Sequence, residues 1–289
     1  MTDQEFDYIV VGAGSAGCVL ASRLSERPET RVLLLEAGPR DTSPWIHLPI
    51  GYGKTMWSDK VNWRFETDPD PNMNGRRIYW PRGKTLGGSS SINGLIYIRG
   101  QKEDYDHWKA AIPLHGGDGP LKVSDIGAKH ELIEAFIGGA EQVGVPRTDD
   151  FNGATQEGAG YFQLNTHNGL RCSTAKAYLT PAVKARPNLR IETEAFAAGL
   201  VLEGRRAVGV RYRQGGQMKT ARAQAEVLLS AGAIQSPQLL QLSGIGPRAL
   251  LEARGVPVVL DLPGVGENLQ DHLQIRLGFE CTKPITTND

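Results

Sequence analysis

Three glycines near the N-terminus have the spacing of a phosphate-binding turn. The motif Gly12-Ala13-Gly14-Ser15-Ala16-Gly17 follows the apolar run 8–11 and opens the segment 15–24, whose apolar residues recur at helical spacing. In such a motif the first glycine permits a tight turn, the second lets a diphosphate approach the backbone, and the third lets the helix pack on the sheet. The helix N-terminus attracts phosphate oxygens. Strand, Gly-x-Gly-x-x-Gly and helix together indicate a dinucleotide site.

An acidic residue supports this interpretation. The apolar run 31–35 ends at Glu36, nineteen residues after Gly17. At this distance a carboxylate can accept hydrogen bonds from ribose hydroxyls. The alternative, a glycine-rich turn that binds nothing, explains neither the spacing nor the acid.

Two further turns combine small residues with a following helical pattern. The segment Gly87-Gly88-Ser89-Ser90-Ser91 precedes the run 92–98, for which we predict a helix. Small residues at a helix start favour the approach of an anionic or planar ligand, although a plain loop explains this segment equally well when it is taken alone. Near the C-terminus, the predicted strand 226–229 leads into Ala231 and Gly232, and we predict a helix with Ser236 as N-cap and Pro237 at its first position.

Other elements follow from the apolar periodicity and from turn signals. We predict strands at 160–166, 189–191 and 207–212, and helices at 132–143, from Ser173 to Leu179, and at 247–254 before Gly255. The long segment 39–82 contains Trp45, Trp57, Trp63 and Trp80. It is either a functional loop or lid, or a loop that its aromatic residues anchor to the core.

Composition excludes several classes of protein. The chain has 289 residues with 32 basic and 32 acidic side chains, so its zero net charge argues against nucleic-acid binding. No apolar run approaches the ~20 residues of a membrane span. The first strand begins close to Met1, so we expect no signal peptide. Cys18, Cys172 and Cys281 are far apart and predict neither a metal site nor a disulfide framework, which favours a cytoplasmic location.

Two longer motifs resemble a known family. The runs 83–106 and 232–246 are similar to the signature motifs of the glucose-methanol-choline (GMC) oxidoreductases, and the N-terminal glycine motif and Asn268-Leu269-Gln270-Asp271-His272 match as well. These are FAD-dependent alcohol dehydrogenases and oxidases, so the resemblance implies FAD where the spacing alone does not separate FAD from NAD. Ile92 occupies the position of the histidine that binds FAD covalently in some members, so we predict non-covalent FAD.

The resemblance also implies a fold and a division into domains. We expect an α/β protein with a discontinuous, Rossmann-like FAD-binding domain and an inserted, incomplete α+β domain on the substrate side. The expected segments are 1–110 and 188–265 for the FAD-binding domain, 116–187 for the insertion, and 266–289 for the start of a further substrate-domain segment.

The motifs and the resemblance together define a predicted cofactor site. Ala197 is expected to contact the adenine through its backbone. The predicted cofactor-binding residues are Gly12, Ala13, Gly14, Ser15, Ala16, Gly17, Glu36, Ala37, Arg82, Gly83, Thr85, Gly87, Gly88, Ser89, Asn93, Gly94, Leu95, Ile96, Ala197, Ala231 and Gly232.

Two departures from the family pattern bear on catalysis. Family members continue past the position of Asp289 with a catalytic histidine, and none of the six histidines here lies in that motif. His272 belongs to a turn that is structural in the family. We therefore expect this chain to lack the catalytic base and to have little or no activity. A helical segment of the relatives is absent between Trp108 and His115, so we expect an irregular junction near Ala111.

The implied reaction is oxidation of the CH–OH group of a small alcohol, with hydride transfer to flavin N5. The segments 38–42 and 80–93 resemble bacterial membrane-associated dehydrogenases of primary aliphatic alcohols, so peripheral membrane association is also implied. Alternatives are a choline dehydrogenase, a non-catalytic FAD-binding fragment, a lyase-type relative that keeps FAD structurally, and a truncated chain that misfolds. The electron acceptor, quinone or oxygen, stays open.

Overall fold

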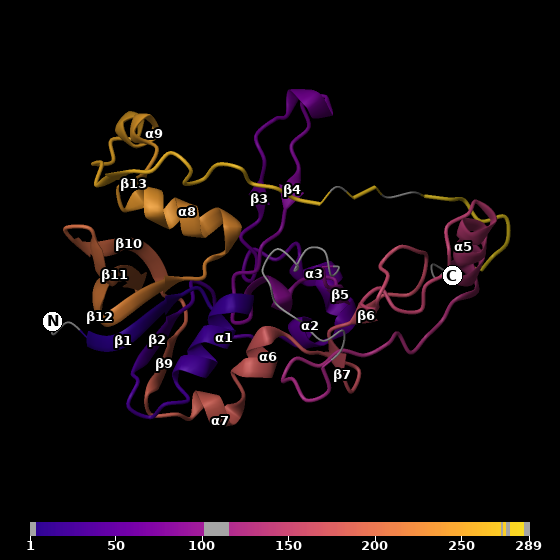
Figure 1. The fold of residues 1–289 in the computed structure, drawn as a ribbon, viewed down its shortest axis with the longest axis horizontal. Helices are drawn as coiled ribbons and strands as arrows, with labels where there is room; N and C mark the ends of the chain where they lie inside the picture. Colours follow the sequence, from indigo (N-terminus) through magenta and orange to yellow (C-terminus); the bar gives the residue numbers. More distant parts are fainter. Residues whose placement is uncertain (1–3, 101–115, 273, 276–277, 286–289) are drawn as a thin grey trace. The chain divides into compact units, whose positions relative to one another are not determined.

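The structure is a computed structural model that describes residues 4–100, 116–272, 274–275 and 278–285 (Figure 1). The chain forms two compact units. The first unit comprises Met1–Gly94 and Asn168–Leu269, and the second comprises Leu95–His167 and Gln270–Asp289. The predicted insertion, 116–187, overlaps the second unit, but residues 168–187 belong to the first. The expected division into functional domains stays a prediction, and the junction expected near Ala111 lies outside the described residues.

A six-stranded sheet forms the centre of the first unit (Figure 1). Its strand order is β10-β11-β12-β1-β2-β9. Four neighbouring strands are parallel, and β10, β11 and β12 form an antiparallel meander at one edge. The strands are β1 (Gln4–Val11), β2 (Val32–Leu35), β9 (Leu189–Glu192), β10 (Phe196–Glu203), β11 (Arg206–Gln214) and β12 (Gln217–Leu229). The expected α/β class with a parallel sheet is confirmed.

Both faces of the parallel strands are covered, which explains their uninterrupted apolar sequences. On one face, Val10 and Leu34 pack with residues of α1 (Ser15–Leu24) and with Leu179. On the other face, Ile9 and Leu33 pack with the meander and with α8 (Gly232–Leu242). Side chains alternate between the faces of a strand, so consecutive apolar residues serve two separate cores.

Short elements complete the first unit. The helix predicted from Ser173 begins there, because the Ser173 hydroxyl accepts a hydrogen bond from the backbone N–H of Lys176 and caps the helix. Gly255, which follows the helix predicted at 247–254, has a φ of +66°. These elements are α2 (Pro44–His47), α3 (Tyr52–Thr55), β3 (Phe65–Glu66), β4 (Tyr79–Trp80), β8 (Leu170–Arg171), α6 (Thr174–Tyr178), α7 (Pro181–Lys184), β13 (Ile245–Gly246), α9 (Arg248–Ala253), β14 (Leu260–Asp261), and 3-10 helices at Pro49–Gly51, Pro71–Met73 and Gly88–Ser91.

The described residues of the second unit form a long helix and short strands. Helix α5 (Glu131–Gln142) begins after His130, whose ring nitrogen accepts a hydrogen bond from the Leu132 N–H. Strand β5 (Ile96–Tyr97) pairs with β6 (Gln163–Leu164), and β7 (Thr166–His167) follows. The strand predicted at 160–166 is therefore broken into short pieces. None of the described helices is long and apolar enough to cross a bilayer.

The prediction for the start of α8 was wrong. The helix begins at Gly232, with Ala231 as N-cap, and Pro237 lies inside it. Gly232 has a φ of +87°, so the chain turns from β12 directly into the helix. The Ser236 hydroxyl accepts a hydrogen bond from the Ala231 N–H from within the helix, at 3.1 Å. Ser followed by Pro often marks a helix start, but here the left-handed conformation of Gly232 starts the helix earlier in the chain.

The helix predicted at 92–98 does not form. The 3-10 helix Gly88–Ser91 ends just before this segment, Leu95 has a φ of +65°, and β5 follows at Ile96. The carbonyl oxygens of Ser90 and Asn93 accept hydrogen bonds from the guanidinium group of Arg171, at 3.1 and 2.8 Å. Both carbonyls therefore find a hydrogen-bond partner on a side chain far away in the sequence.

Candidate cofactor-binding site

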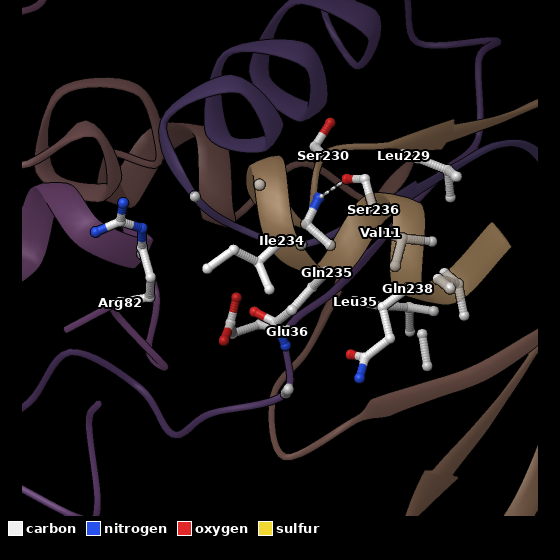
Figure 2. A pocket seen from close by; sticks show the side chains of 18 of the residues that line it. Val11, Leu35, Glu36, Arg82, Leu229, Ser230, Ile234, Gln235, Ser236 and Gln238 are labelled. Atoms are coloured by element: carbon white, nitrogen blue, oxygen red, sulfur yellow. Dashed lines mark hydrogen bonds between the residues drawn. The ribbon is translucent and has the colours of Figure 1, made fainter. Parts of the chain in front are cut away.

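A cavity of about 540 Å³ lies in the first unit, where β1, β2 and β12 end and α1 and α8 begin (Figure 2). In open α/β sheets ligands bind beyond the carboxyl ends of parallel strands, and this cavity has that position. Its volume is in the usual range for small-molecule sites. The lining residues are Val11, Gly12, Gly14, Ser15, Ala16, Leu35, Glu36, Ala37, Trp63, Arg82, Gly83, Gly88, Ser89, Ala195, Phe196, Ala197, Leu229, Ser230, Ala231, Gly232, Ala233, Ile234, Gln235, Ser236, Gln238, Leu239 and Leu242.

The glycines of this cavity have two different roles. Gly12 has a φ of +97°, and a Cβ there would lie 2.6 Å from the Ser230 carbonyl oxygen, so the fold itself requires this glycine. At Gly14 the nearest protein atom to an added Cβ would be 3.9 Å away, and at Gly232 none lies within 4 Å. Their missing side chains leave open space beside the backbone, which fits a ligand that must approach main-chain atoms.

Two helix N-termini meet at this space. Gly14 is the N-cap of α1 and Ala231 is the N-cap of α8, and neither helix has a side-chain cap. The first N–H groups of a helix have no partner inside it, and the helix dipole places positive charge there. The cavity therefore presents two uncapped, electropositive helix ends next to bare glycines. This arrangement suits a diphosphate and fits the phosphate groups of FAD.

The carboxylate of Glu36 forms the ribose side of the predicted site. The residue is 5% exposed, and its two oxygens accept hydrogen bonds from the Ala13 N–H at 3.0 Å and the Gly38 N–H at 2.9 Å. Burial raises the pKa of the Glu36 carboxyl to about 7, against the opposite effect of these N–H groups and the Lys84 charge. Figure 2 shows the carboxylate at the cavity. Each oxygen keeps lone-pair capacity for a ligand hydroxyl.

Two aromatic rings line the same cavity. The ring centroids of Trp63 and Phe196 lie 6.1 Å apart at an interplanar angle of 57°, and Ala197 follows Phe196 in the lining. Because the two rings are tilted, each offers its own flat apolar face to a planar ligand ring. The guanidinium group of Arg82, which Figure 2 shows at the edge of the cavity, lies 5.0 Å from the centre of the Trp80 ring. It adds a positive charge to the lining of the cavity.

The predicted site residues divide into three groups. Thirteen line the cavity: Gly12, Gly14, Ser15, Ala16, Glu36, Ala37, Arg82, Gly83, Gly88, Ser89, Ala197, Ala231 and Gly232. Six others of the first unit do not line it: Ala13, Gly17, Thr85, Gly87, Asn93 and Gly94. Leu95 and Ile96 belong to the second unit. The role of each residue in FAD binding stays a prediction.

Several residues outside the lining support it. Ala13 donates its N–H to Glu36, and its carbonyl oxygen accepts a hydrogen bond from the Gly87 N–H at 2.7 Å. The buried hydroxyl of Thr85 donates to the Pro39 carbonyl at 2.9 Å. The bond between Gly87 and Ala13 joins the turn around Gly87 directly to the glycine-rich turn of α1, and the bond from Thr85 joins it to the segment after β2.

Part of the cavity lining was not predicted from the sequence. Ile234, Gln235, Gln238 and Leu242 share one face of α8, a pattern that a helix start at Gly232 would have revealed. Trp63 and Phe196 carried no signal, because only the fold brings them together. None of the described residues that line the cavity is a histidine. His272 is exposed and its N–H bonds to the Asp271 carboxylate. The described residues contain no cluster of three or more His, Cys, Asp or Glu side chains suited to a metal ion.

Comparisons with known proteins agree with this geometry. The family model described as GMC oxidoreductase matches residues 6–274. Mitochondrial choline dehydrogenase of Mus musculus is 48% identical over 313 residues, covering 98% of this chain and 52% of that protein. The alcohol dehydrogenase [acceptor] of Pseudomonas putida is 48% identical, covering 94% and 54%. The oxygen-dependent choline dehydrogenase of Vibrio vulnificus is 46% identical, covering 99% and 55%. The chain thus spans about half the length of the curated relatives it matches.

Solved structures show the same similarity. Pyridoxine 4-oxidase from Mesorbium loti superposes with a TM-score of 0.84 at 34% identity, covering 89% of this chain and 55% of that one. A FAD-dependent oxidoreductase from Chaetomium thermophilum superposes with a TM-score of 0.80 at 28% identity, covering 90% and 51%.

Proposed function

This chain belongs to the GMC oxidoreductase family, whose members depend on FAD, and from that premise we propose that its first unit binds FAD without a covalent bond. We propose further that it supplies the cofactor-binding part of an oxidoreductase that acts on the CH–OH group of an alcohol.

One observation carries the proposal: two uncapped helix N-termini with bare glycines meet at a cavity that also contains a buried carboxylate. Gly14 and Gly232 would admit the diphosphate, and Glu36 would accept hydrogen bonds from the ribose. Trp63 and Phe196 would contact the adenine beside Ala197. FAD, when bound, accepts a hydride at flavin N5, while the residues of this chain hold and orient it.

Non-covalent binding is supported by the environment of Ile92. This residue is 4% exposed and packs with Ile46 and Val61. An aliphatic side chain has no nucleophilic atom that could bond to a flavin, and the position of the histidine that binds FAD covalently in some family members holds a core residue here.

As substrates we propose primary alcohols, with choline at least as well supported as aliphatic alcohols. The choline dehydrogenases of Mus musculus and Vibrio vulnificus are 48% and 46% identical to this chain, and the Pseudomonas putida alcohol dehydrogenase is 48% identical. The sequence motifs favoured the aliphatic type, and the comparisons remove that preference. A quinone or oxygen as acceptor, a cytoplasmic location and peripheral membrane association stay predictions.

A second candidate is flavin binding without turnover. It is favoured by the lining of the cavity, where no described residue is a histidine that could accept the alcohol proton. Anaerobic addition of choline or a primary aliphatic alcohol to the FAD-loaded chain separates the two candidates. Bleaching of the flavin absorption would support alcohol oxidation by this chain. Retained flavin that no alcohol bleaches would support binding alone, which is the result we expect.

A further inference from the structure

The largest fully buried side chain among the described residues belongs to Arg171, which is 1% exposed. Its guanidinium forms no ion pair with any described acidic residue; the acceptors are neutral oxygens. Burial lowers the pKa of Arg171 only to about 10, so the group is charged at neutral pH. A buried charge without a counter-ion costs free energy unless hydrogen bonds compensate for the lost solvation. The hydrogen bonds of the Arg171 guanidinium must therefore supply this compensation.

The guanidinium donates to two segments that are far apart in the sequence, α2 and the residues around Ser90 and Asn93. Nε donates to the Ile46 carbonyl in α2 at 2.8 Å. Nη1 donates to the Ser90 carbonyl at 3.1 Å and to Asn93 Oδ1 at 2.7 Å, and Nη2 donates to the Asn93 carbonyl at 2.8 Å. Only the planar, five-donor fork of arginine can serve such a set of acceptors from one side chain.

Ser90 and Asn93 belong to the serine turn, which we define as residues 87–93. Gly88 and Ser89 of this turn line the cavity, and a Cβ added to Gly88 would lie 2.7 Å from the Cα of Gly14. Arg171 binds the turn immediately after these residues. The Ser90 hydroxyl fastens it a second time, because it donates to the Gly87 carbonyl at 2.6 Å and accepts from the Thr174 N–H at 3.0 Å.

Arg171 lies close to the point where the chain returns to the first unit. The chain leaves the first unit after Gly94 and returns to it at Asn168. The bonds from Arg171 to Asn93 therefore join the outgoing and returning segments on the side of the first unit. They hold the end of the serine turn within the first unit.

We propose that Arg171 is a positioning residue for the cofactor: it holds the serine turn in the conformation that presents Gly88 and Ser89 to the cavity. The inference rests on the proposed FAD binding. A purely stabilising role of Arg171 would affect FAD binding only as much as an equal loss of stability elsewhere in the chain does. The positioning role predicts that loss of Arg171 weakens FAD binding more than that.

The test compares Arg171→Met with Arg186→Met in the full 289-residue chain. Arg186 is the control: it is half-buried, its guanidinium also donates to a backbone carbonyl, that of Ser22 at 2.6 Å, and to the Ser25 hydroxyl at 2.8 Å, and it does not line the cavity. FAD dissociation constants are measured by fluorescence titration, and melting temperatures are measured without FAD. We expect both variants to melt earlier, but only Arg171→Met to bind FAD about tenfold or more weakly.

Arg171→Lys provides the second variant if Arg171→Met does not fold. Lysine keeps the charge but lacks the planar fork, so we expect weaker FAD binding together with faster amide hydrogen exchange in residues 88–93 and unchanged exchange in β1. Equal FAD affinity in wild type and folded Arg171 variants would overturn the inference and leave FAD binding intact. A wild-type chain that binds no FAD would refute the proposed function as well, so the two failures are distinguishable.

Discussion

The carboxylate of Glu36 accepts a hydrogen bond from the backbone N–H of Ala13 at 3.0 Å, across 23 positions of sequence. The second carboxylate oxygen accepts from the Gly38 N–H at 2.9 Å. The acid predicted to bind a ribose thus also connects the glycine-rich turn to the end of β2. Ligand recognition and the shape of the turn depend on the same side chain.

Glu36→Gln should weaken FAD binding by about tenfold to a hundredfold, because hydrogen bonds to a charged acceptor contribute about 1.5–3 kcal/mol. Glutamine keeps the size but replaces one acceptor oxygen by an NH₂ group that faces a backbone N–H donor. FAD titration of the variant checks this. Glu203→Gln, which loses only an exposed ion pair with Arg222, should bind FAD as the wild type does.

The raised pKa of Glu36 predicts a pH dependence of stability. Its folded pKa of about 7 exceeds the ordinary value of 4.5, so the folded state binds the proton more tightly. The contribution of Glu36 is therefore most favourable below pH 4.5 and is lost as the pH rises towards 7, by an amount on the order of 3 kcal/mol. Urea unfolding of the FAD-free chain at pH 5 and pH 8 measures it. The difference between the two pH values should shrink in Glu36→Gln, and an unchanged difference would contradict the assignment.

Two glycines of one motif should respond differently to alanine. Gly12→Ala should destabilise the chain by about 1–3 kcal/mol, because its φ of +97° is strained for alanine and Cβ would approach the Ser230 carbonyl. Gly14→Ala should change stability by no more than about 0.5 kcal/mol, since its Cβ meets only open space, yet it should greatly reduce FAD binding. Denaturant unfolding and FAD titration of both variants separate the roles. Normal FAD affinity in Gly14→Ala would show that the diphosphate does not approach this glycine.

The aromatic pair gives a prediction about the adenine. Trp63→Leu and Phe196→Leu should each weaken binding of FAD and of ADP by about tenfold, because stacking on a base contributes about 1–3 kcal/mol. Isothermal titration with ADP provides the measurement without the flavin ring. Trp45→Leu is the control, since Trp45 lies against Lys54 and does not line the cavity. If Trp63→Leu and Phe196→Leu bind ADP as tightly as the control Trp45→Leu does, the adenine does not contact this aromatic pair.

The sequence predicted the elements whose signal is local. The buried strands β1 and β2, the glycine turn into α1 and the acid Glu36 follow from patterns within forty residues, and the structure has them in place. The start of α8 and the missing helix after Ser91 could not be predicted. Gly232 adopts a left-handed φ that composition does not reveal, and the Ser90 and Asn93 carbonyls accept hydrogen bonds from Arg171, about 80 residues away.

The candidate site shows the same division. The backbone positions around Gly14, Gly88 and Gly232 were recognisable because glycine has few reasons to recur at such spacing. The aromatic rings of Trp63 and Phe196 come from segments that only the tertiary fold unites. Side chains that line a cavity from irregular segments carry no periodic signal, so sequence reasoning finds the phosphate side of a nucleotide site before the base side.

The most direct test of the account is whether the purified 289-residue chain holds FAD. The chain is incubated with FAD and desalted, its visible spectrum is recorded, and the protein is then precipitated with acid. We predict flavin absorption bands at about one FAD per chain before precipitation and free flavin in the supernatant afterwards. A colourless desalted protein would contradict FAD binding, and flavin that stays in the precipitate would contradict its non-covalent nature.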